Sequence, residues 1–277
     1  MKLIADSGSS KTDWALAEDG SSPSVVSTQG INPVHQDRQT IEKVLLSELL
    51  PQLAGQRIDE VYFYGSGVRP TETALMQDVL SSALPSARHI EAHGDLLGAA
   101  RALCGRSEGI ACILGTGSNS CLYNGQLIVA NTPPLGYVLG DEGGGAVLGI
   151  RFLNALYKGG LNDALRRDFE TETGLTLSRI IDCVYRKPLA NRFLASLSVF
   201  IREHVDDPSV SAIVVDNFRA FLVRNVNAYA RRDLPVSFVG SIAYYFSQQL
   251  VESLKSEGYN LGQISRSPLK ALVDFHC

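Results

Sequence analysis

Apolar runs alternate with turns rich in glycine, serine and threonine along the first third of the chain. Residues 2–6 form a short apolar run that is typical of a buried strand. Over residues 37–53 the apolar side chains recur at helical spacing, which predicts a helix with one buried face. The same reasoning predicts the other elements of this part: strands at 14–17, 25–28, 61–64 and 89–92, and helices at 75–84 and 95–103.

The same order of elements begins again at residue 110. A strand at 110–114 is followed by a polar turn and a strand at 120–123, and Asn124-Gly125 predicts a two-residue hairpin into a strand at 127–130. Beyond Gly144 the pattern is mostly helical, and its apolar stripes, such as Leu177, Ile180, Ile181 and Val184, are expected in the core. A helix at 211–231 and a strand at 235–239 complete the series. The repeat predicts an α/β protein with two related domains and a ligand cleft between them.

Composition and charge exclude several classes of protein. The chain has 277 residues, 45% of them hydrophobic, and 25 glycines that follow no regular period. About 7% glycine is ordinary, so this excess without a period excludes collagen-like and low-complexity chains. The net charge of −4 comes without a basic stripe. We therefore expect neither a nucleic acid nor an anionic membrane surface as a partner.

Three further features concern the compartment. The five cysteines form no C-x-x-C pair, which favours the reducing cytoplasm over a disulfide framework. The first residues do not have the pattern of a signal peptide. Residues 109–140 carry no charge, but asparagines and the pair Pro133-Pro134 interrupt the run. Because a membrane helix needs about 20 mostly apolar residues, we expect a buried hairpin here and a cytoplasmic protein.

Two glycine-containing turns are candidate phosphate sites. In 6–12 (Asp-Ser-Gly-Ser-Ser-Lys-Thr) a glycine between hydroxyl residues lets backbone N–H groups face an anion, and Lys11 adds a positive charge. The segment is not a P-loop, because no glycine precedes Lys11 and a strand follows. A polar hairpin turn explains it about equally well. The turn 115–119 (Gly-Thr-Gly-Ser-Asn) leaves the first strand of the repeat in the same way. Two such turns could hold one polyphosphate.

Carboxylates mark two further candidates. In 140–145 (Gly-Asp-Glu-Gly-Gly-Gly) the glycines allow close approach to a ligand, and the alternative is a loop at a helix start with Asp141 and Glu142 favoured by the helix dipole. Asp95 follows Gly94 at a predicted helix start, where a helix N-cap is the ordinary interpretation. Asn32 before proline is a common turn signal. The histidines and cysteines show no zinc-ligand spacing.

Taken together, these segments resemble the sugar kinase/actin/chaperone ATPase superfamily. More narrowly they are similar to the N-acetylglucosamine kinase group of the BadF/BadG-type ATPase family, which also contains activator ATPases. The resemblance covers nearly the whole chain. It implies two related ribonuclease H-like (actin-like ATPase) domains with an interdomain cleft. It also implies domain limits of 1–108, joined by a terminal helix at 265–277, and 109–264.

The resemblance implies a role for each candidate residue. Asp95 would be the catalytic base, which accepts the proton of the attacking hydroxyl, and Asp6 would orient Mg²⁺, through water. ATP would be held by Asp6, Gly8, Ser9, Ser10, Lys11 and Thr12 in the first turn, by Gly115, Thr116, Gly117 and Ser118 in the second, and by Gly240 and Ser241 in an adenosine loop. The sugar would contact Asn32, Asp95, Thr116, Gly136, Tyr137, Asp141 and Glu142.

The resemblance therefore implies an ATP-dependent kinase that phosphorylates an amino sugar, with N-acetylglucosamine to its 6-phosphate as the expected reaction. A homodimer is common among the proteins that it resembles. Tyr137 stands where tryptophan is frequent, and Gly143-Gly144 replaces the usual Gly-Ser, so glucosamine, N-acetylmuramate and neutral hexoses stay open. Two other functions also stay open: an activator ATPase with an iron–sulfur cluster, and a nucleotide-gated sugar-binding regulatory protein.

Overall fold

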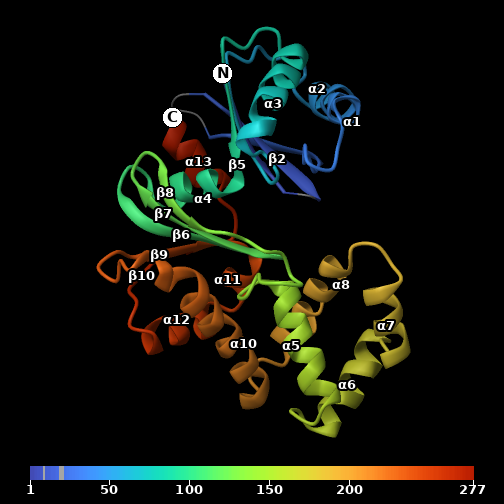
Figure 1. The fold of residues 1–277 in the computed structure, drawn as a ribbon. Helices are drawn as coiled ribbons and strands as arrows, with labels where there is room; N and C mark the ends of the chain where they lie inside the picture. The colour runs from blue at the N-terminus through green and yellow to red at the C-terminus, as the bar shows by residue number, and fades with distance from the viewer. Residues whose placement is uncertain (9, 19–21) are drawn as a thin grey trace. The chain divides into compact units, whose positions relative to one another are not determined.

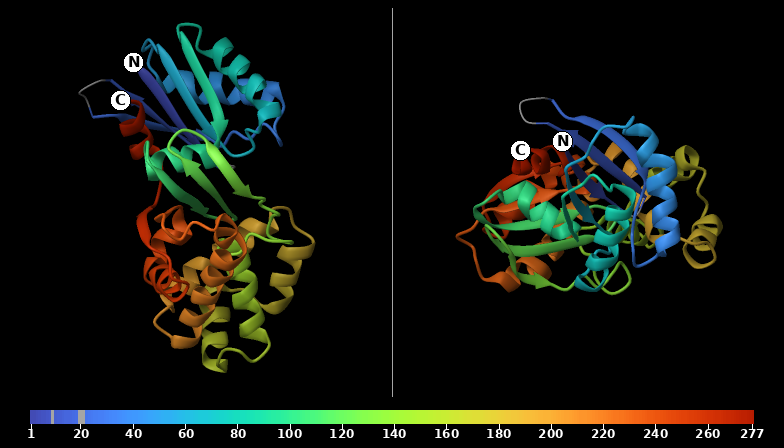
Figure 2. Two further views of the ribbon diagram at one scale, coloured as in Figure 1. Left: turned by 60° about the vertical axis from the view of Figure 1, so that its left-hand side comes forward. Right: turned by 90° about the horizontal axis from the view of Figure 1, so that it is seen from above.

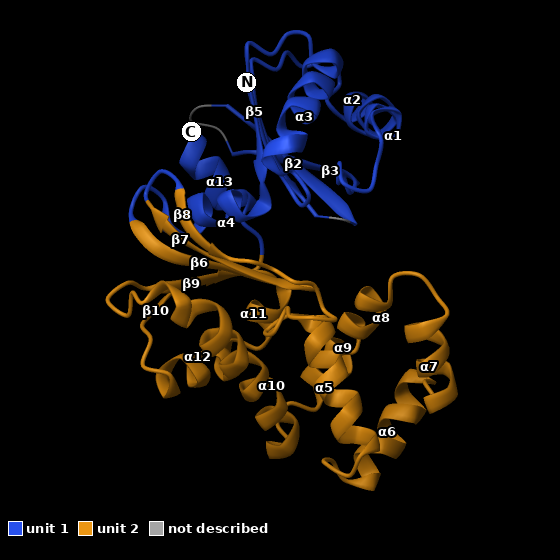
Figure 3. Ribbon diagram, viewed as in Figure 1, with its two compact units in different colours: residues 1–107, 125–127, 267–277 blue, residues 108–124, 128–266 orange. Residues whose placement is uncertain are grey.

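A computed structural model describes residues 1–8, 10–18 and 22–277. The chain divides into two compact units. Unit 1 comprises residues 1–107, 125–127 and 267–277, and unit 2 comprises residues 108–124 and 128–266 (Figure 3). Within the described residues, none of the helices is both long and apolar enough to cross a membrane.

Unit 1 is built on a mixed five-stranded sheet in the order β3-β2-β1-β4-β5 (Figure 1). β1 pairs antiparallel with β2 and parallel with β4, while β4 pairs parallel with β5. Ser7 at the end of β1 is in register with Gly65, which is in register with Gly94. The carboxyl ends of three parallel strands therefore meet at one edge of the sheet. The strands are β1 (Lys2–Ser7), β2 (Lys11–Ala17), β3 (Ser24–Gln29), β4 (Glu60–Gly65) and β5 (His89–Gly94).

Helices cover both faces of this sheet. On one face α1, the π-helix after it and α3 pack around Trp14 and Phe63, both fully buried. On the other face α4 and the C-terminal α13 pack around Ile4 and Tyr64, and Figure 2 shows α13 (red) beside α4 from two directions. Pro70 at the first position of α3 starts this helix five residues before the apolar pattern predicted. The helices are α1 (Arg38–Val44), a π-helix (Leu45–Leu49), α2 (Leu50–Gln52), α3 (Pro70–Ala83), α4 (Asp95–Cys104) and α13 (Leu269–His276).

Unit 2 repeats the topology of the first sheet. Its order is β10-β9-β6-β7-β8, in which β6 pairs antiparallel with β7 and parallel with β9, as β1 does with β2 and β4. The repeat predicted from the sequence is therefore present, and the two ribonuclease H-like folds are confirmed. The strands are β6 (Glu108–Leu114), β7 (Ser118–Asn124), β8 (Ile128–Thr132), β9 (Val236–Val239) and β10 (Leu261–Ser265).

The helices of unit 2 pack on β6 and β9 around one apolar core. The predicted helix at 211–231 is α10 (Pro208–Phe221), continued by a π-helix (Leu222–Val226) and a short 3-10 turn (Asn227–Tyr229). The Asp207 carboxylate caps its start. The other helices are α5 (Gly145–Tyr157), α6 (Asp163–Thr173), α7 (Leu177–Tyr185), α8 (Ala190–Ser196), α9 (Ser198–Glu203), α11 (Ser241–Tyr245) and α12 (Ser247–Ser256).

Two local predictions are wrong. The β7–β8 connection has three residues, Gly125 to Leu127, because β8 begins only at Ile128 and Gly125 alone takes a positive φ of 92°. The apolar stripe of α7 is only partly core: Ile180 is buried, whereas Leu177 and Ile181 are 50% and 47% exposed. A helix at the surface of a unit can cover the core with only one side of its apolar stripe.

Candidate active site

In unit 1, two buried hydroxyl groups hold the first candidate phosphate turn, residues 6–12, in place. Ser7 Oγ lies 2.6 Å from Thr12 Oγ1, and it donates to the Ile31 carbonyl at 2.9 Å. Gly8 N donates to Lys11 O at 3.0 Å and closes the turn. Thr12 is fully buried, so its hydroxyl acts inside the fold. The exposed tip consists of residues Gly8, Ser10 and Lys11, while Ser9 lies outside the described residues.

Asp6 and Asp95 lie at the edge where the parallel strands end. Asp6 is on β1, one residue before the turn, and Asp95 follows Gly94 at the end of β5. Burial, together with the nearby carboxylates of Asp95 and Asp13, raises the pKa of Asp6 to about 7, and Lys11 opposes this rise. Burial also raises the pKa of Asp95, against the lowering effect of backbone N–H groups. The structure therefore brings together two carboxylates that titrate above their usual range.

Asp95 is not the cap of α4. Gly94 is the N-cap and Asp95 is the first helical residue, and no side chain caps this helix. The interpretation of Asp95 as a helix N-cap is therefore wrong. Its carboxylate is buried near Asp6, and backbone N–H groups at the start of α4 donate to it.

The carboxylate oxygens here fit a magnesium ion. Mg²⁺ prefers oxygen ligands and binds kinases through one or two carboxylates, waters and substrate phosphates. Among the described residues, Asp95 and Asp13 repel the Asp6 carboxylate, and the positive charge of Lys11 opposes this repulsion. A cation in front of Asp6 would offset this repulsion. Among the described residues, no group of three histidine, cysteine or carboxylate side chains is arranged to bind a metal by itself.

Asn32 is close to the same edge of unit 1. Its Oδ1 accepts from Val34 N at 3.0 Å and lies against Gly67, where a Cβ atom would collide with it. Asn32 is 7% exposed, and among the described residues its Nδ2 donates no hydrogen bond. Gly67 belongs to the loop after β4, which the sequence patterns did not single out as part of the site. The Nδ2 group of Asn32 is therefore available to donate a hydrogen bond to a ligand.

In unit 2, the second phosphate turn and the start of α5 are joined by backbone hydrogen bonds. Gly145 N donates to Gly115 O at 2.8 Å, and Ala146 N donates to Thr116 O at 2.9 Å. The carbonyl groups of the turn thereby satisfy the first N–H groups of α5. Gly115 N itself donates to Gly117 O at 3.0 Å. The turn is held rigidly, and the Thr116 side chain at its tip is exposed.

The loop of residues 133–144, between β8 and α5, carries the predicted acceptor contacts and is called the acceptor loop. Asp141 joins this loop to the second turn. Its Oδ1 accepts from Gly136 N at 3.1 Å, and a Cβ atom at Gly117 would lie 2.5 Å from its Oδ2. Asp141 has a φ of 58°, in the left-handed region that is uncommon for residues with a side chain. Burial, with the neighbouring Glu142, raises the pKa of Asp141. Tyr137 lies in the same loop and is half-buried.

The three adjacent glycines each meet a different part of unit 2. A Cβ atom at Gly143 would collide with Phe221 and one at Gly144 with the backbone of Gly117, while one at Gly145 would be in tight contact with Ile242. Gly143 also has a φ of 81°. Their absence of side chains therefore serves the packing of this loop within unit 2.

Gly240 completes the cluster of loops. It has a φ of 124° and lies against the carbonyl of Leu114, directly before the second phosphate turn. Its N–H donates to Ser265 O at 3.0 Å. Gly240 is the N-cap of α11, and Ser241 after it is exposed. The predicted residues of unit 2 therefore converge at the carboxyl end of β6 and β9.

Two residues that sequence reasoning missed hold the acceptor loop. Asn217, fully buried on α10, accepts from Gly143 N at 3.2 Å. Arg224 donates to Glu142 Oε1 at 2.6 Å. A polar residue on the apolar face of a predicted helix was a signal that could have found Asn217, since it lies between the core positions Val214 and Phe218. Arg224 gave no such signal.

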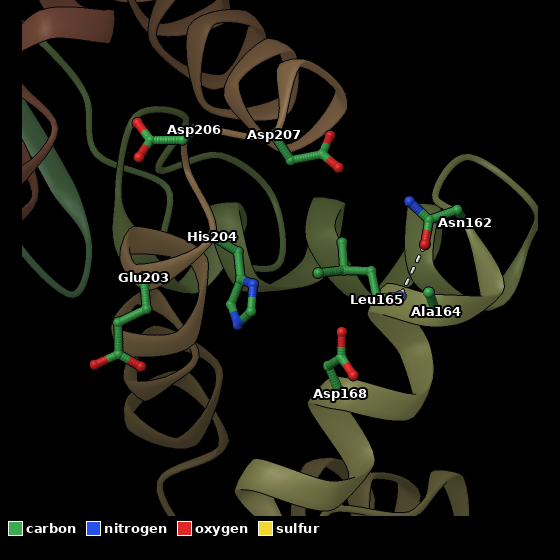
Figure 4. Close-up of a pocket in the computed structure, with 8 residues that line it drawn as sticks. All are labelled: Asn162, Ala164, Leu165, Asp168, Glu203, His204, Asp206 and Asp207. Atoms are coloured by element: carbon green, nitrogen blue, oxygen red, sulfur yellow. Dashed lines mark hydrogen bonds between the residues drawn. The ribbon is translucent and has the colours of Figure 1, made fainter.

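A hollow of about 330 Å³ lies elsewhere in unit 2 (Figure 4). Its carboxylates would repel a phosphate group. Two of its polar residues have structural roles, because Asn162 Oδ1 caps α6 and Asp207 Oδ1 caps α10. None of the predicted site residues lines it. The lining residues are Asn162, Ala164, Leu165, Asp168, Glu203, His204, Asp206 and Asp207.

The structure was compared with those of known proteins. It is similar to a candidate N-acetylglucosamine kinase from Porphyromonas gingivalis, with 51% sequence identity, a TM-score of 0.97, and 100% of this chain and 98% of the other covered. A candidate N-acetylglucosamine kinase from Chromobacterium violaceum matches at 18% identity and a TM-score of 0.76, over 99% and 98% of the two chains. A ROK family glucokinase from Streptomyces griseus, in complex with glucose and AMPPNP, matches at 12% identity and a TM-score of 0.62, over 98% of each chain. The last two share the fold. No protein-family model and no curated protein matches the sequence.

Two sheets of one topology, each with a glycine-containing turn after its first strand, define a protein of the sugar kinase/actin/chaperone ATPase superfamily. Within this superfamily, the chain belongs to the family of N-acetylglucosamine kinase-like sugar kinases. It is a phosphotransferase with an alcohol group as acceptor.

Proposed function

We propose that this sugar kinase transfers the γ-phosphoryl group of ATP to a hydroxyl group of an amino sugar, with N-acetylglucosamine as the acceptor and its 6-phosphate as the product. The observation that carries the proposal is the pair Asp6 and Asp95 at one edge of the unit 1 sheet, beside the first phosphate turn. The likeness to the Porphyromonas gingivalis protein, with 51% identity, supports the choice of sugar.

In this proposal Asp95 is the catalytic base. Phosphoryl transfer needs the acceptor hydroxyl to lose its proton as the bond to phosphorus forms, and a positioned carboxylate accepts that proton. The raised pKa of Asp95 makes it a better proton acceptor than an exposed carboxylate. Exclusion of water from the site would prevent hydrolysis of the donor.

One proposed phosphate-binding turn belongs to each unit. In unit 1 this is the turn with Gly8, Ser10 and Lys11 at its exposed tip, and Asp6 would hold Mg²⁺, which neutralises phosphate charge when bound. In unit 2 the turn comprises Gly115 to Ser118, and Gly240 with Ser241 would hold the adenosine. Lys11 is 60% exposed and ion-paired with Asp13 at 2.8 Å, so its positive charge is balanced until phosphate arrives.

The proposed sugar contacts lie separately in each unit. Asn32 would offer its Nδ2, and Asp141 would accept hydrogen bonds from sugar hydroxyls, the usual role of such side chains in sugar recognition. The other proposed contacts are Asp95, Thr116, Gly136, Tyr137 and Glu142.

The test is the release of ADP by the purified protein over a panel of sugars. We expect release with N-acetylglucosamine, and loss of more than 10²-fold in kcat for Asp95→Asn, as is typical when a general base is removed, with nucleotide affinity retained. Asp274→Asn is the matched control, because its carboxylate is 63% exposed and pairs only with Lys270 on α13. Wild-type turnover by Asp95→Asn would contradict the mechanism, and ADP release without any sugar would contradict the function.

The activator ATPase alternative is disfavoured by the cysteines. An iron–sulfur cluster shared across a dimer axis needs accessible thiolates, whereas Cys112 and Cys121 are fully buried in β6 and β7. A regulatory protein that binds sugar without turnover would lack a base, and Asp95 is present.

We further propose that the enzyme acts in the cytoplasm as a homodimer. The elution volume in size-exclusion chromatography, combined with light scattering, tests the dimer.

A further inference from the structure

One helix of unit 2 contacts three consecutive residues of the acceptor loop. Asn217 on α10 accepts from Gly143 N at 3.2 Å and donates from Nδ2 to Gly144 O at 3.4 Å. Arg224, two turns further along, donates to Glu142 Oε1 at 2.6 Å. The Glu142 side chain is 11% exposed, and one of its two oxygens accepts from Arg224, whose own side chain is 68% exposed.

The π-helix that carries Arg224 also reaches the other end of the loop. The carbonyl group of Asn225 accepts from Thr132 Oγ1 at 2.8 Å, and Thr132 is the last residue of β8, directly before the loop. A π-helix widens the helix by an extra residue per turn and is frequent at functional sites. Two consecutive residues of this π-helix, Arg224 and Asn225, therefore contact the residues that flank segment 133–141 on either side.

The residue held between these contacts is Asp141. Its left-handed backbone, with a φ of 58°, is an unfavourable conformation for a residue with a side chain. Such a conformation persists only where the surroundings fix it. On one side Gly136 N donates to its carboxylate, and on the other Glu142 and Gly143 are held by Arg224 and Asn217.

We propose that Arg224 and Asn217 are positioning residues for the acceptor sugar. Arg224 acts through Glu142, and Asn217 acts through Gly143 and Gly144, so that the Asp141 carboxylate points beside Gly117 in the second phosphate turn. The inference rests on the proposed function, in which Asp141 binds the sugar.

Arg224→Met tests this with a matched control. Its side chain is 68% exposed, so the substitution is expected to leave the melting temperature unchanged. The KM for N-acetylglucosamine should rise about tenfold, the factor for one charge-assisted hydrogen bond, while kcat and the KM for ATP stay as in the wild type. Arg224→Lys should restore part of the loss. Arg219→Met removes an exposed ion pair with Glu257 on the same helix and should change nothing. Equal sugar KM values for the two methionine variants would overturn the proposal.

A double-mutant cycle tests the route through Glu142. If Arg224 acts only by holding Glu142, then Glu142→Met, which removes both acceptor oxygens, combined with Arg224→Met should be no worse for the sugar KM than Glu142→Met alone. If the two substitutions raise the sugar KM by factors that multiply, Arg224 and Glu142 act independently. This result would overturn the route through Glu142. Asn217→Asp keeps the acceptor for Gly143 N but loses the donor to Gly144 O, and it should also raise the sugar KM.

Hydrogen exchange separates this proposal from the proposed function, because it needs no sugar. The amides of Leu139 and Gly140 donate to Gly136 O within the loop, and Gly143 donates to Asn217. Peptides that cover 133–145 should exchange faster in Arg224→Met than in Arg219→Met or the wild type. Unchanged exchange would overturn the positioning role. If the wild type phosphorylates no sugar, the proposed function fails, while the exchange result still decides whether Arg224 holds the loop.

Discussion

Gly144 packs directly against Gly117, so closely that a Cβ atom on Gly144 would lie 2.7 Å from the Gly117 carbonyl carbon. One residue belongs to the acceptor loop and the other to the second phosphate turn. With the hydrogen bond from Gly145 N to Gly115 O at 2.8 Å, this contact makes the two segments one rigid piece of unit 2. The proposed sugar and phosphate sites are therefore fixed relative to each other by backbone packing.

Gly144→Ala is expected to damage this rigid piece. Its new methyl group would meet backbone atoms, which cannot move aside as a flexible side chain can. Overpacking of this kind costs about 1–3 kcal/mol, so the melting temperature should fall. Gly115→Ala is the matched control for folding, because its methyl group would meet nothing within 4 Å and its φ is not positive. Equal melting temperatures of the two variants would contradict the close contact.

Asp6→Asn is expected to stabilise the free protein while it destroys activity. The folded protein holds the pKa of Asp6 at about 7, above its usual 3.8, mainly because the carboxylate is buried. The folded state therefore binds more protons than the unfolded state between these values, and this contribution to stability is lost as the pH rises. The difference corresponds to at most about 4 kcal/mol at pH 8. Removal of the charge should raise the melting temperature at pH 8 and much less at pH 4.

The measurement is thermal unfolding of Asp6→Asn without nucleotide or magnesium at the two pH values. Asp13→Asn is the control, since Asp13 lies opposite Asp6 on β2 but is ion-paired with Lys11 at 2.8 Å. It should give little or no stabilisation. An Asp6→Asn variant that melts below the wild type at pH 8 would refute the assignment of a buried, unfavourable charge to Asp6.

The order of strands was predictable because most strands are apolar runs between glycine-containing turns. β10 was not predicted, since three of its five residues are exposed and it has no apolar run. The three-residue connection at Gly125 was also mispredicted. The close approach of Gly125 to the Arg106 carbonyl depends on residues distant in the chain. Such tertiary contacts leave no mark in a local pattern.

The candidate site was predictable only in part. The glycine turns and carboxylates could be named from their types and spacing, but only the structure shows that the N-cap of α4 is Gly94 and not Asp95. Arg224 lies 82 positions from its partner Glu142, and an exposed arginine in a helix is ordinary in a sequence. The glycines at 143–145 were expected to let a ligand approach. In the structure they allow this loop to pack closely against other segments of unit 2.

His276 is expected to make the stability of the protein fall in mild acid. Burial, with the positive charges of Arg101 and Lys2 nearby, lowers its pKa to about 4, against the opposing effects of Glu91 and Glu60. The ring stacks on Tyr62 and is hydrogen-bonded to the Tyr64 hydroxyl at 2.8 Å. The unfolded state binds more protons than the folded state between pH 4 and 6.5, so stability present at pH 7 is lost as the pH falls through this window.

This effect is opposite in sign to that of Asp6, which favours the folded state as the pH falls. The variant that separates them is His276→Gln. Between pH 7 and 5, its melting temperature should fall less than that of the wild type, by about 2–4 °C for each kcal/mol of the difference. His204→Gln is a control, as its ring is paired only with Glu172 and Phe200 in unit 2. If the melting temperatures of His276→Gln and the wild type fall by the same amount between pH 7 and 5, the assignment of a neutral, buried His276 is contradicted.

The catalytic rate is expected to fall in acid at a pH above the usual range of an aspartate. Asp95 must be ionised to accept the proton of the acceptor hydroxyl, and burial raises its pKa. The acidic limb of kcat/KM for the sugar reports the ionisation of the free enzyme, so it should lie above the ordinary value of 3.8. The measurement is the pH profile of ADP release at limiting sugar and saturating ATP. An acidic limb at or below 3.8 would contradict the role of a buried Asp95 as the base.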